Sequence, residues 1–187
     1  MGRPRRLRSL RLPRRPGQAI LLIALLAILA ALRHWCPEVF QPAPTGPLEP
    51  GLYRVARVVD GDTFVLADAN EKIRLLGADT PETVHPRRPI EPWGPEATEF
   101  TEEFLAGGEV RLEFDVEPRD KHGRILAHVW VGDRMLSEEL IRAGLARAML
   151  RYPFSAAVKS RLRRAEAEAK NARRGIWSAG GGSAHGL

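Results

Sequence analysis

The sequence predicts an α+β fold, a five-stranded β-barrel capped by three α-helices, with an N-terminal membrane-anchor or signal segment before it. Two observations predict the folded part. Short apolar runs are separated by turn residues such as Asp60-Gly61, and three longer runs carry apolar residues at helical spacing. A third observation predicts the N-terminal segment, because a continuous apolar stretch follows an arginine-rich arm.

The apolar stretch runs without interruption from residue 19 to residue 32. A membrane-spanning helix needs about 20 residues, so this stretch suits either a short anchor or the hydrophobic part of a signal sequence. No small-x-small cleavage site follows it, and Trp35 is a residue type found at membrane interfaces. These features favour an uncleaved anchor at 19–35, while the basic arm at 1–18 is also compatible with simple disorder.

The positive charge of the chain is concentrated at its N-terminus. Residues 1–36 contain eight arginines and no acidic residue, whereas the rest of the chain has 21 basic and 23 acidic residues. The pI of about 10.2 is therefore not evidence for a basic folded domain. Because most of these arginines precede the apolar stretch, the positive-inside rule predicts a folded domain outside the cytoplasm, or secreted if the segment is cleaved.

The remaining chain divides into three parts. A proline-rich linker at 36–51 should be extended and semi-rigid. The folded domain is expected at 52–178, and a glycine-rich flexible tail at 179–187. The single cysteine, Cys36, excludes an internal disulfide and a multi-cysteine zinc site.

Alternating or β-branched runs predict five strands, at residues 53–59, 63–67, 72–77, 110–116 and 125–131. Three helices are expected at 94–106, 135–143 and 155–174, the first opening at Gly94-Pro95 and the second stopping at Gly144. The core faces should be formed by Ala97, Phe100, Phe104 and Leu105 in the first helix and by Ala157, Val158, Leu162, Ala165 and Ala169 in the third. Five strands and three helices in this order match an OB-fold barrel capped by helices.

Two acidic clusters flank the second hairpin of the predicted barrel. Asp62 begins one strand, Asp79 and Glu82 follow the next, and Arg74 lies within it. Carboxylates gathered without a lysine repel each other unless a cation lies among them, and the planar guanidinium of an arginine fits a phosphate. Asp60 is expected to serve the turn itself, with a water-mediated link to the site as the lesser alternative. Metal, phosphate and a spare carboxylate together suggest phosphodiester hydrolysis.

Three segments in this order resemble the staphylococcal, or micrococcal, nuclease family of thermonuclease-like domains. They are the run from Asp60 to Glu82, the string Asp120-Lys121-His122-Gly123-Arg124, and the terminal Gly175-Ile176-Trp177-Ser178. The resemblance extends from about Tyr53 to Ser178 and implies the same OB-fold.

The resemblance also implies roles for individual residues. Asp62 and Asp79, with the backbone carbonyl of Thr80, would hold a catalytic Ca²⁺, an ion that favours oxygen ligands. Glu82 would act as general base for the attacking water, and Arg74 and Arg124 would stabilise the charge that builds on the phosphate. Without the neighbouring motif, each of these residues could be a solvated or turn-capping side chain.

Substrate contacts are less well marked in the sequence. Tyr152 and Lys121 are the candidate nucleotide contacts, and Arg87-Arg88 could also meet phosphates. Leu150 and His122 stand where the family has tyrosines, which affects the expected nucleotide affinity rather than the chemistry.

The resemblance implies a Ca²⁺-dependent endonuclease that hydrolyses DNA and RNA, with single-stranded or locally open substrate preferred, and leaves 3′-phosphate ends. The alternative is a non-catalytic OB-fold module, tethered to a membrane, that binds nucleic acid or a protein. Retention of the complete set of five residues (Asp62, Arg74, Asp79, Glu82 and Arg124) favours the enzyme, because a binding module does not need all of them.

Overall fold

The computed structural model describes residues 20–21, 23–28, 31, 48–84, 89–115 and 119–178. The chain divides into two units, Met1–Pro42 and Ala43–Leu187, which are described separately.

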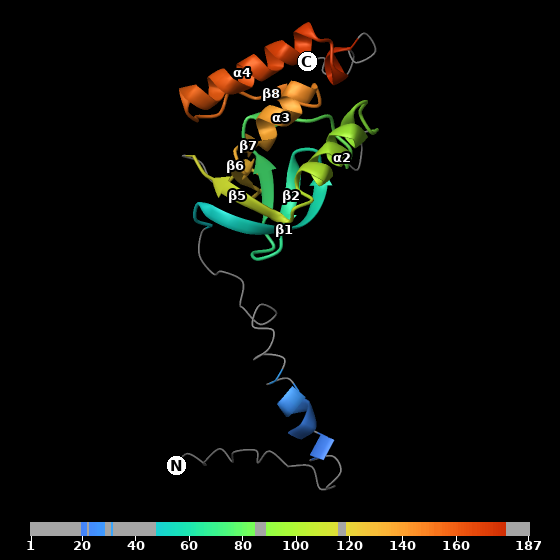
Figure 1. The fold of residues 1–187 in the computed structure, drawn as a ribbon, viewed down its shortest axis with the longest axis vertical. Helices are drawn as coiled ribbons and strands as arrows, with labels where there is room; N and C mark the ends of the chain where they lie inside the picture. Colours follow the sequence, from blue (N-terminus) through green and yellow to red (C-terminus); the bar gives the residue numbers. More distant parts are fainter. Residues whose placement is uncertain are drawn as a thin grey trace, which may run out of the picture. The chain divides into compact units, whose positions relative to one another are not determined.

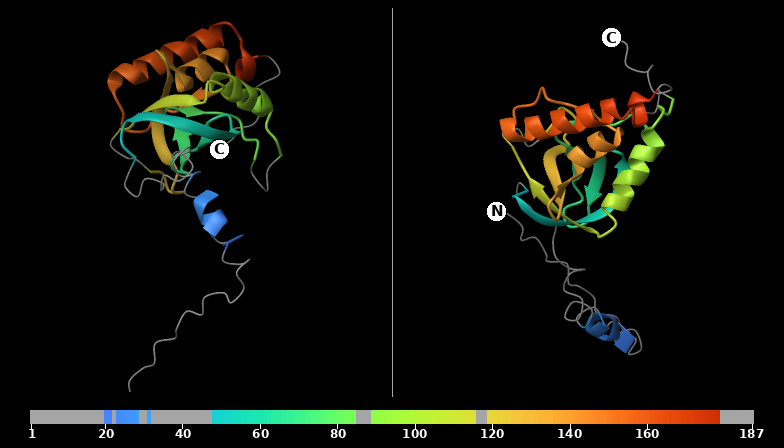
Figure 2. Two further views of the ribbon diagram at one scale, coloured as in Figure 1. Left: turned by 60° about the horizontal axis from the view of Figure 1, so that its bottom comes forward. Right: turned by 45° about the horizontal axis from the view of Figure 1, so that its top comes forward.

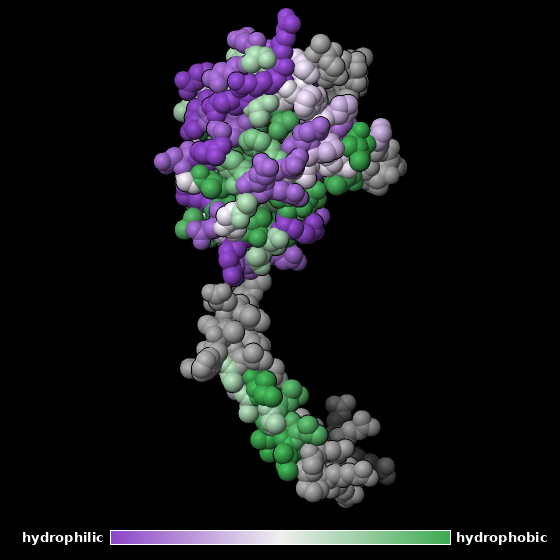
Figure 3. Space-filling view, turned by 45° about the vertical axis from the view of Figure 1, so that its right-hand side comes forward, coloured by the Kyte–Doolittle hydropathy of each residue, from purple (hydrophilic) through white to green (hydrophobic). Residues whose placement is uncertain are grey.

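The described residues of the first unit belong to the predicted anchor at 19–35. They are helical and carry hydrophobic side chains throughout, as Figure 3 shows. Across the described part of the chain, no helix combines the length and apolar character needed to cross a bilayer. The basic arm at 1–18, most of the linker at 36–51 and the tail at 179–187 lie outside the described residues.

Five strands close into a barrel in the second unit (Figure 1). Neighbouring strands pair in the order β3-β2-β1-β5-β6, and β6 returns to pair in parallel with β3. The strands are β1 (Gly51–Asp60), β2 (Thr63–Leu66), β3 (Lys72–Leu75), β5 (Glu109–Glu113) and β6 (Ile125–Val131). This confirms the predicted five-stranded barrel with helices, an α+β arrangement that fits the OB-fold.

The barrel interior is filled by the apolar residues that alternate along the strands. In β5, Val110 and Leu112 are buried while Glu109 is exposed, so the side chains alternate between core and solvent as a pleated strand requires. Strand β2 is buried along its whole length, from Thr63 to Leu66, and pairs on both sides, with β1 and with β3.

Three further strands of two residues each are too short to show any sequence period, and were not predicted. They are β4 (Ala78–Asp79), β7 (Arg134–Met135) and β8 (Arg147–Ala148). Strands β4 and β8 pair with each other, Ala78 opposite Ala148 and Asp79 opposite Arg147. This small sheet fixes the chain after β8 next to the chain that carries Asp79.

Among the described residues of the second unit, the helices are α2 (Gly94–Phe104), α3 (Leu136–Ala143) and α4 (Ala156–Asn171), followed by the 3-10 turn η2 (Gly175–Trp177). Figures 1 and 2 show α3 between the barrel and α4, while α2 packs beside β1. The Ser155 side chain accepts a hydrogen bond from the Val158 N–H and so begins α4. The prediction that Ala157 belongs to the apolar face of α4 is wrong, because its side chain is exposed. Ala157 lies in the first turn of the helix, before the helix crosses the core.

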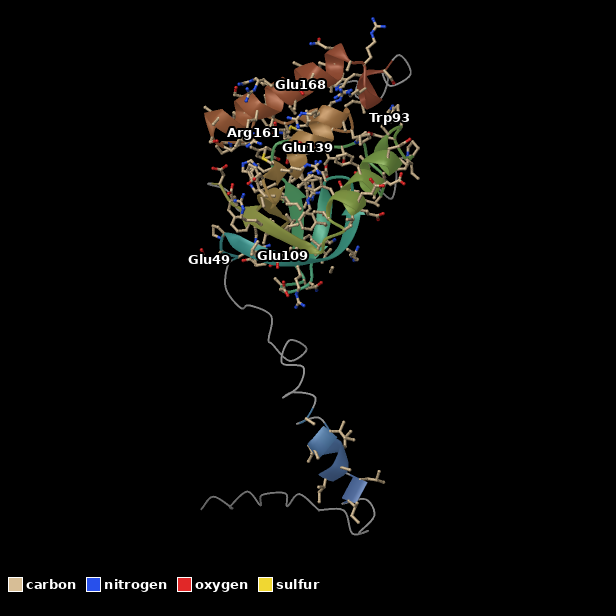
Figure 4. All side chains as sticks on the ribbon, in the orientation of Figure 1. Glu49, Trp93, Glu109, Glu139, Arg161 and Glu168 are labelled. Atoms are coloured by element: carbon tan, nitrogen blue, oxygen red, sulfur yellow. The ribbon has the colours of Figure 1, made fainter. Side chains whose placement is uncertain are left out.

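Charged side chains join α3 to α4. Glu138, although buried, accepts hydrogen bonds from Arg142 of its own helix and Arg161 of α4. Arg142 also pairs with Glu139 and with Glu168 of α4. Glu139, Arg161 and Glu168 are labelled in Figure 4 at this junction between the two helices.

Candidate active site

The turn between β1 and β2 brings Asp62 into the site. Asp60 pairs with Thr63 across this turn, and the Asp60 carboxylate accepts the Asp62 N–H at 3.2 Å. A Cβ on Gly61 would lie 2.7 Å from Ala97 Cβ of α2 and 2.9 Å from Thr80 Cγ2, so only glycine fits. Thr101 of α2 donates a hydrogen bond to the Gly61 carbonyl at 2.6 Å. The turn is thereby held against α2, which agrees with the structural role expected for Asp60.

Asp62 is almost completely buried, and both oxygens of its carboxylate accept hydrogen bonds. One oxygen accepts from Arg74 and from the Thr63 hydroxyl, and the other accepts the Thr80 N–H at 3.0 Å. Burial raises the pKa of Asp62 to about 7, against the opposing charge of Arg74. A buried carboxylate of this kind is favoured in its ionised form by an adjacent cation.

Arg74 lies between the two predicted metal-ligating carboxylates. Its Nη1 donates to Asp62 and its Nη2 to Asp79, so one guanidinium spans both acidic clusters. Burial opposes the charged form of Arg74, but the neighbouring Asp62 and Asp79 outweigh that effect and raise its pKa. Strand pairing explains the placement, because Arg74 lies opposite Thr63 in β2 and opposite Leu126 in β6.

A cavity of about 160 Å³ opens at these residues. It is lined by Asp60, Asp62, Arg74, Asp79, Thr80, Glu82 and Glu91. Five carboxyl groups therefore face the same space as a single guanidinium. The remaining lining residue, Thr80, also offers oxygen atoms.

The donor set fits a hard divalent cation such as Ca²⁺ or Mg²⁺. Asp62, Asp79 and the Thr80 carbonyl are the residues that would hold it, and the second oxygen of Asp79 accepts no hydrogen bond from the described residues. The described residues include no group of three acidic, histidine or cysteine side chains arranged around one metal position. A set of two carboxylates and one carbonyl would leave coordination places for water and substrate.

Glu82 lines the same cavity, on the segment that follows β4. Its carboxylate accepts the N–H groups of Thr83 and Val84, at 3.1 and 3.0 Å, which fixes the side chain. The backbone of Glu82 is bonded twice to Glu91: its N–H donates to the Glu91 carboxylate and its carbonyl accepts the Glu91 N–H. Glu91 was not predicted, because an isolated glutamate in a proline-rich loop has no distinguishing sequence signal.

Arg124 lies on a second, larger groove and is held by Asp120. The Asp120 carboxylate accepts the Nε–H of Arg124 at 2.8 Å and, through its other oxygen, the backbone N–H groups of His122 and Arg124. Burial acts to raise the pKa of Asp120, but these hydrogen bonds together outweigh it and lower the pKa. The sequence marks Asp120 only as part of a motif, whereas its hydrogen bonds identify it as the residue that orients Arg124.

The groove has a volume of about 450 Å³ and lies next to the acidic cavity, with which it shares two lining residues, Arg74 and Asp79. The predicted substrate contacts Lys121 and Tyr152 line it, as does His122. Met149 and Arg151 also line it and were not predicted.

Leu150, expected at a nucleotide-binding position, packs against the hydrophobic core instead. Arg87 and Arg88 lie outside the described residues.

Comparison with known proteins connects this geometry to a described family. The family model for staphylococcal nuclease homologues matches residues 72–179. A thermonuclease of Staphylococcus intermedius is 45% identical over 127 residues, covering 67% of this chain and 75% of that protein. A thermonuclease of Staphylococcus hyicus is 37% identical over 162 residues, covering 84% and 95%. Endonuclease YncB of Bacillus subtilis (strain 168) is 38% identical over 128 residues, covering 67% and 61%.

Proposed function

The chain belongs to the staphylococcal nuclease family, and from this membership we propose that it is a Ca²⁺-dependent endonuclease of DNA and RNA that leaves 3′-phosphate ends. The resemblance seen in the sequence is thus confirmed, and the protein is a nuclease, an enzyme that hydrolyses phosphodiester bonds. The metal, the substrate range and the product ends are our proposal.

One observation carries the proposal. Arg74 joins Asp62 to Asp79 in the acidic cavity and also lines the basic groove that contains Arg124. A phosphodiester bound where the two spaces meet would have carboxylates on one side and guanidinium groups on the other. This is the charge arrangement that hydrolysis of a phosphodiester needs, because negative charge builds on the phosphate oxygens while water is deprotonated.

In the proposed mechanism the chain's own residues bind the phosphate, orient the attacking water and accept its proton. Arg74 and Arg124 donate hydrogen bonds to the phosphate oxygens and stabilise the transition state more than the ground state, because charge increases there. Glu82 orients the attacking water and accepts its proton as the water oxygen bonds to phosphorus. The bond from phosphorus to the 5′ oxygen breaks, and this oxygen leaves and takes up a proton from the solvent. A Ca²⁺ held by Asp62, Asp79 and the Thr80 carbonyl would neutralise phosphate charge and help to place the water.

Cleavage of single-stranded DNA by the purified protein, with and without added divalent metal, tests the proposal. We expect cleavage in Ca²⁺, little in Mg²⁺, which requires stricter octahedral geometry, and none in chelator. Equal rates in Ca²⁺ and Mg²⁺ would contradict the proposed metal site. Binding of DNA without cleavage under every condition would favour the non-catalytic module instead. End analysis of the products distinguishes 3′-phosphate from 5′-phosphate.

For localisation we propose that the N-terminal segment at 19–35 tethers the nuclease domain to a membrane on its extracytoplasmic side. The arginine excess before the apolar stretch supports this topology. A C-terminal reporter that is active only outside the cytoplasm is the expected result, and one active only inside would contradict the proposal. Cleavage at the segment would instead release the domain as a secreted enzyme.

A further inference from the structure

The larger groove contains more positive charge than the reacting phosphate requires. Five basic side chains line it in addition to Arg74, namely Arg119, Lys121, His122, Arg124 and Arg151. Two of these are already paired, Arg119 with Glu71 and Arg124 with Asp120. Arg151 is exposed, and no carboxylate of the described residues lies within ion-pairing distance of it. Its charge is therefore free for a ligand.

Arg151 lies against the aromatic side chain that follows it. Its guanidinium carbon is 5.4 Å from the centre of the Tyr152 ring, which is within the range of a cation–π interaction. Tyr152 is half-buried and packed against the core, so its ring is a fixed surface. A guanidinium stacked on a ring keeps its N–H groups at the edge of its own plane, where they can donate to a phosphate.

The pairing of β4 with β8 places Arg151 away from the reacting end of the groove. Arg147 is opposite Asp79, Ala148 is opposite Ala78, and the Met149 N–H donates to the Gly77 carbonyl at 2.9 Å. The chain thus runs antiparallel to β4 and moves away from Asp79 as it continues toward residue 151. Arg151 is accordingly displaced along the groove from the metal-ligating carboxylate.

We propose that Arg151 binds a phosphate of the polynucleotide substrate outside the reacting phosphodiester, beside the nucleotide contact expected at Tyr152. The inference rests on the proposed nuclease function and adds a substrate-binding residue, Arg151, to it. A strand whose base lies near Tyr152 can bring a neighbouring phosphate to Arg151.

Two kinds of substrate test the proposal in the full-length protein. One is a DNA single strand of about 12 nucleotides, within the length range that one OB-fold accommodates. The other is a p-nitrophenyl ester of thymidine 5′-phosphate, which has only the reacting phosphodiester. The variant is Arg151→Ala, and its matched control is Arg163→Ala, an exposed arginine of α4 that does not line the groove. The control removes the same charge from the same domain.

For Arg151→Ala we expect the ratio of kcat/KM for the single strand to kcat/KM for the small ester to fall by about tenfold, mostly through KM, which corresponds to loss of about 1.4 kcal/mol of binding. The slope of log kcat/KM against log salt concentration should decrease by about 0.7, as expected for one lost phosphate contact to a single strand. Arg163→Ala should change the ratio less than twofold. Equal ratios in the two variants would overturn the proposal.

A binding measurement separates this inference from the proposed function. Fluorescence anisotropy of the labelled single strand is measured in a Glu82→Gln background, where turnover is blocked. We expect Arg151→Ala to weaken binding by about tenfold in this background, relative to Arg163→Ala. This result without cleavage by the wild-type protein would support the Arg151 site and count against the nuclease mechanism. Unchanged binding would overturn the Arg151 site whatever the cleavage rate.

Discussion

Asp120 holds Arg124 from two directions, accepting the guanidinium Nε–H with one carboxylate oxygen and the backbone N–H with the other. The same oxygen that bonds the Arg124 backbone also bonds the His122 N–H, so Asp120 fixes the whole turn. The direction of the Arg124 guanidinium is consequently set by a residue that need not touch substrate.

We therefore expect Asp120→Asn to slow cleavage by about 10²-fold, chiefly in kcat, because a small misplacement of a transition-state donor has an effect of this size. Asparagine retains one acceptor oxygen but loses the charge and adds an N–H₂ group. Steady-state kinetics on single-stranded DNA measure the effect. Asp68→Asn is the matched control, because Asp68 forms an exposed ion pair with Arg54 away from the groove. Equal kcat in both variants would contradict the orienting role.

Glu82 and Arg124 are expected to affect different parts of the reaction. Glu82→Gln should lower kcat by about 10²–10⁴-fold while substrate affinity stays close to that of the wild type, since Glu82 would contact the attacking water. Arg124→Lys keeps the charge but loses the two-pronged geometry, and should raise the barrier by about 3 kcal/mol. Rates at saturating substrate and separate affinities distinguish the two. Near wild-type rates in both would disprove the catalytic assignment.

The Gly61 turn offers a test of how the site depends on close packing. A Cβ at residue 61 would meet Ala97 and Thr80 at distances that real atoms do not adopt. Gly61→Ala should lower the free energy of unfolding by about 1–3 kcal/mol and reduce kcat, because the displaced turn carries Asp62. Gly107→Ala is the control, since nothing lies within 4 Å of a Cβ there. Urea unfolding and kinetics on both variants check this, and equal stability would refute the packing argument.

The Glu138 junction should affect stability without affecting chemistry. Glu138→Gln removes the charge that bonds Arg142 and Arg161, and is expected to lower the free energy of unfolding by about 2 kcal/mol. Glu168→Gln, at a more exposed carboxylate of the same network, should lower it by less than about 1 kcal/mol. Chemical unfolding measures the difference. A lower kcat of Glu138→Gln under conditions where the variant is fully folded would show that the junction influences the active site.

His128 predicts a pH dependence of stability near neutral pH. Burial lowers the pKa of His128, and the bond from its ring to Asp115 opposes the shift without reversing it. The unfolded chain therefore binds a proton at a higher pH than the native one does, so stability is full above about pH 6.5 and falls as the solution is acidified toward the native pKa. Urea unfolding between about pH 7 and about pH 5 should show this decrease in the wild type and less of it in His128→Gln. An equal decrease in stability in both proteins would show that a group other than His128 causes it.

The sequence predicted the barrel well because its strands carry local signals. Asp60-Gly61 marks the first turn and the residues of β5 alternate, so both could be recognised from short windows. The two-residue strand β4 could not, and neither could its partner β8, because their existence depends on tertiary pairing. The same limit applies to Ala157, whose exposure follows from where α4 crosses the core.

For the site, the motif identified a group of five residues, and the structure brings them to two adjacent cavities. They are Asp62, Arg74, Asp79, Glu82 and Arg124. What the residues do remains a prediction. Met149 and Arg151 belong to no sequence motif, so they were not predicted. Both line the groove while Leu150 packs against the core, an arrangement that depends on tertiary structure and that no local pattern reveals.

The parallel pairing of β3 with β6 has a consequence for the order in which the enzyme is made. Arg74 finds its neighbour Leu126 only after β6 has been synthesised, and β4 finds β8 later still. Such distant pairings form late and slowly, since long loops must close first. A growing chain on the ribosome therefore carries Asp62 and Arg74 through most of translation without an assembled site. The active site can therefore be complete only once the polypeptide is nearly finished.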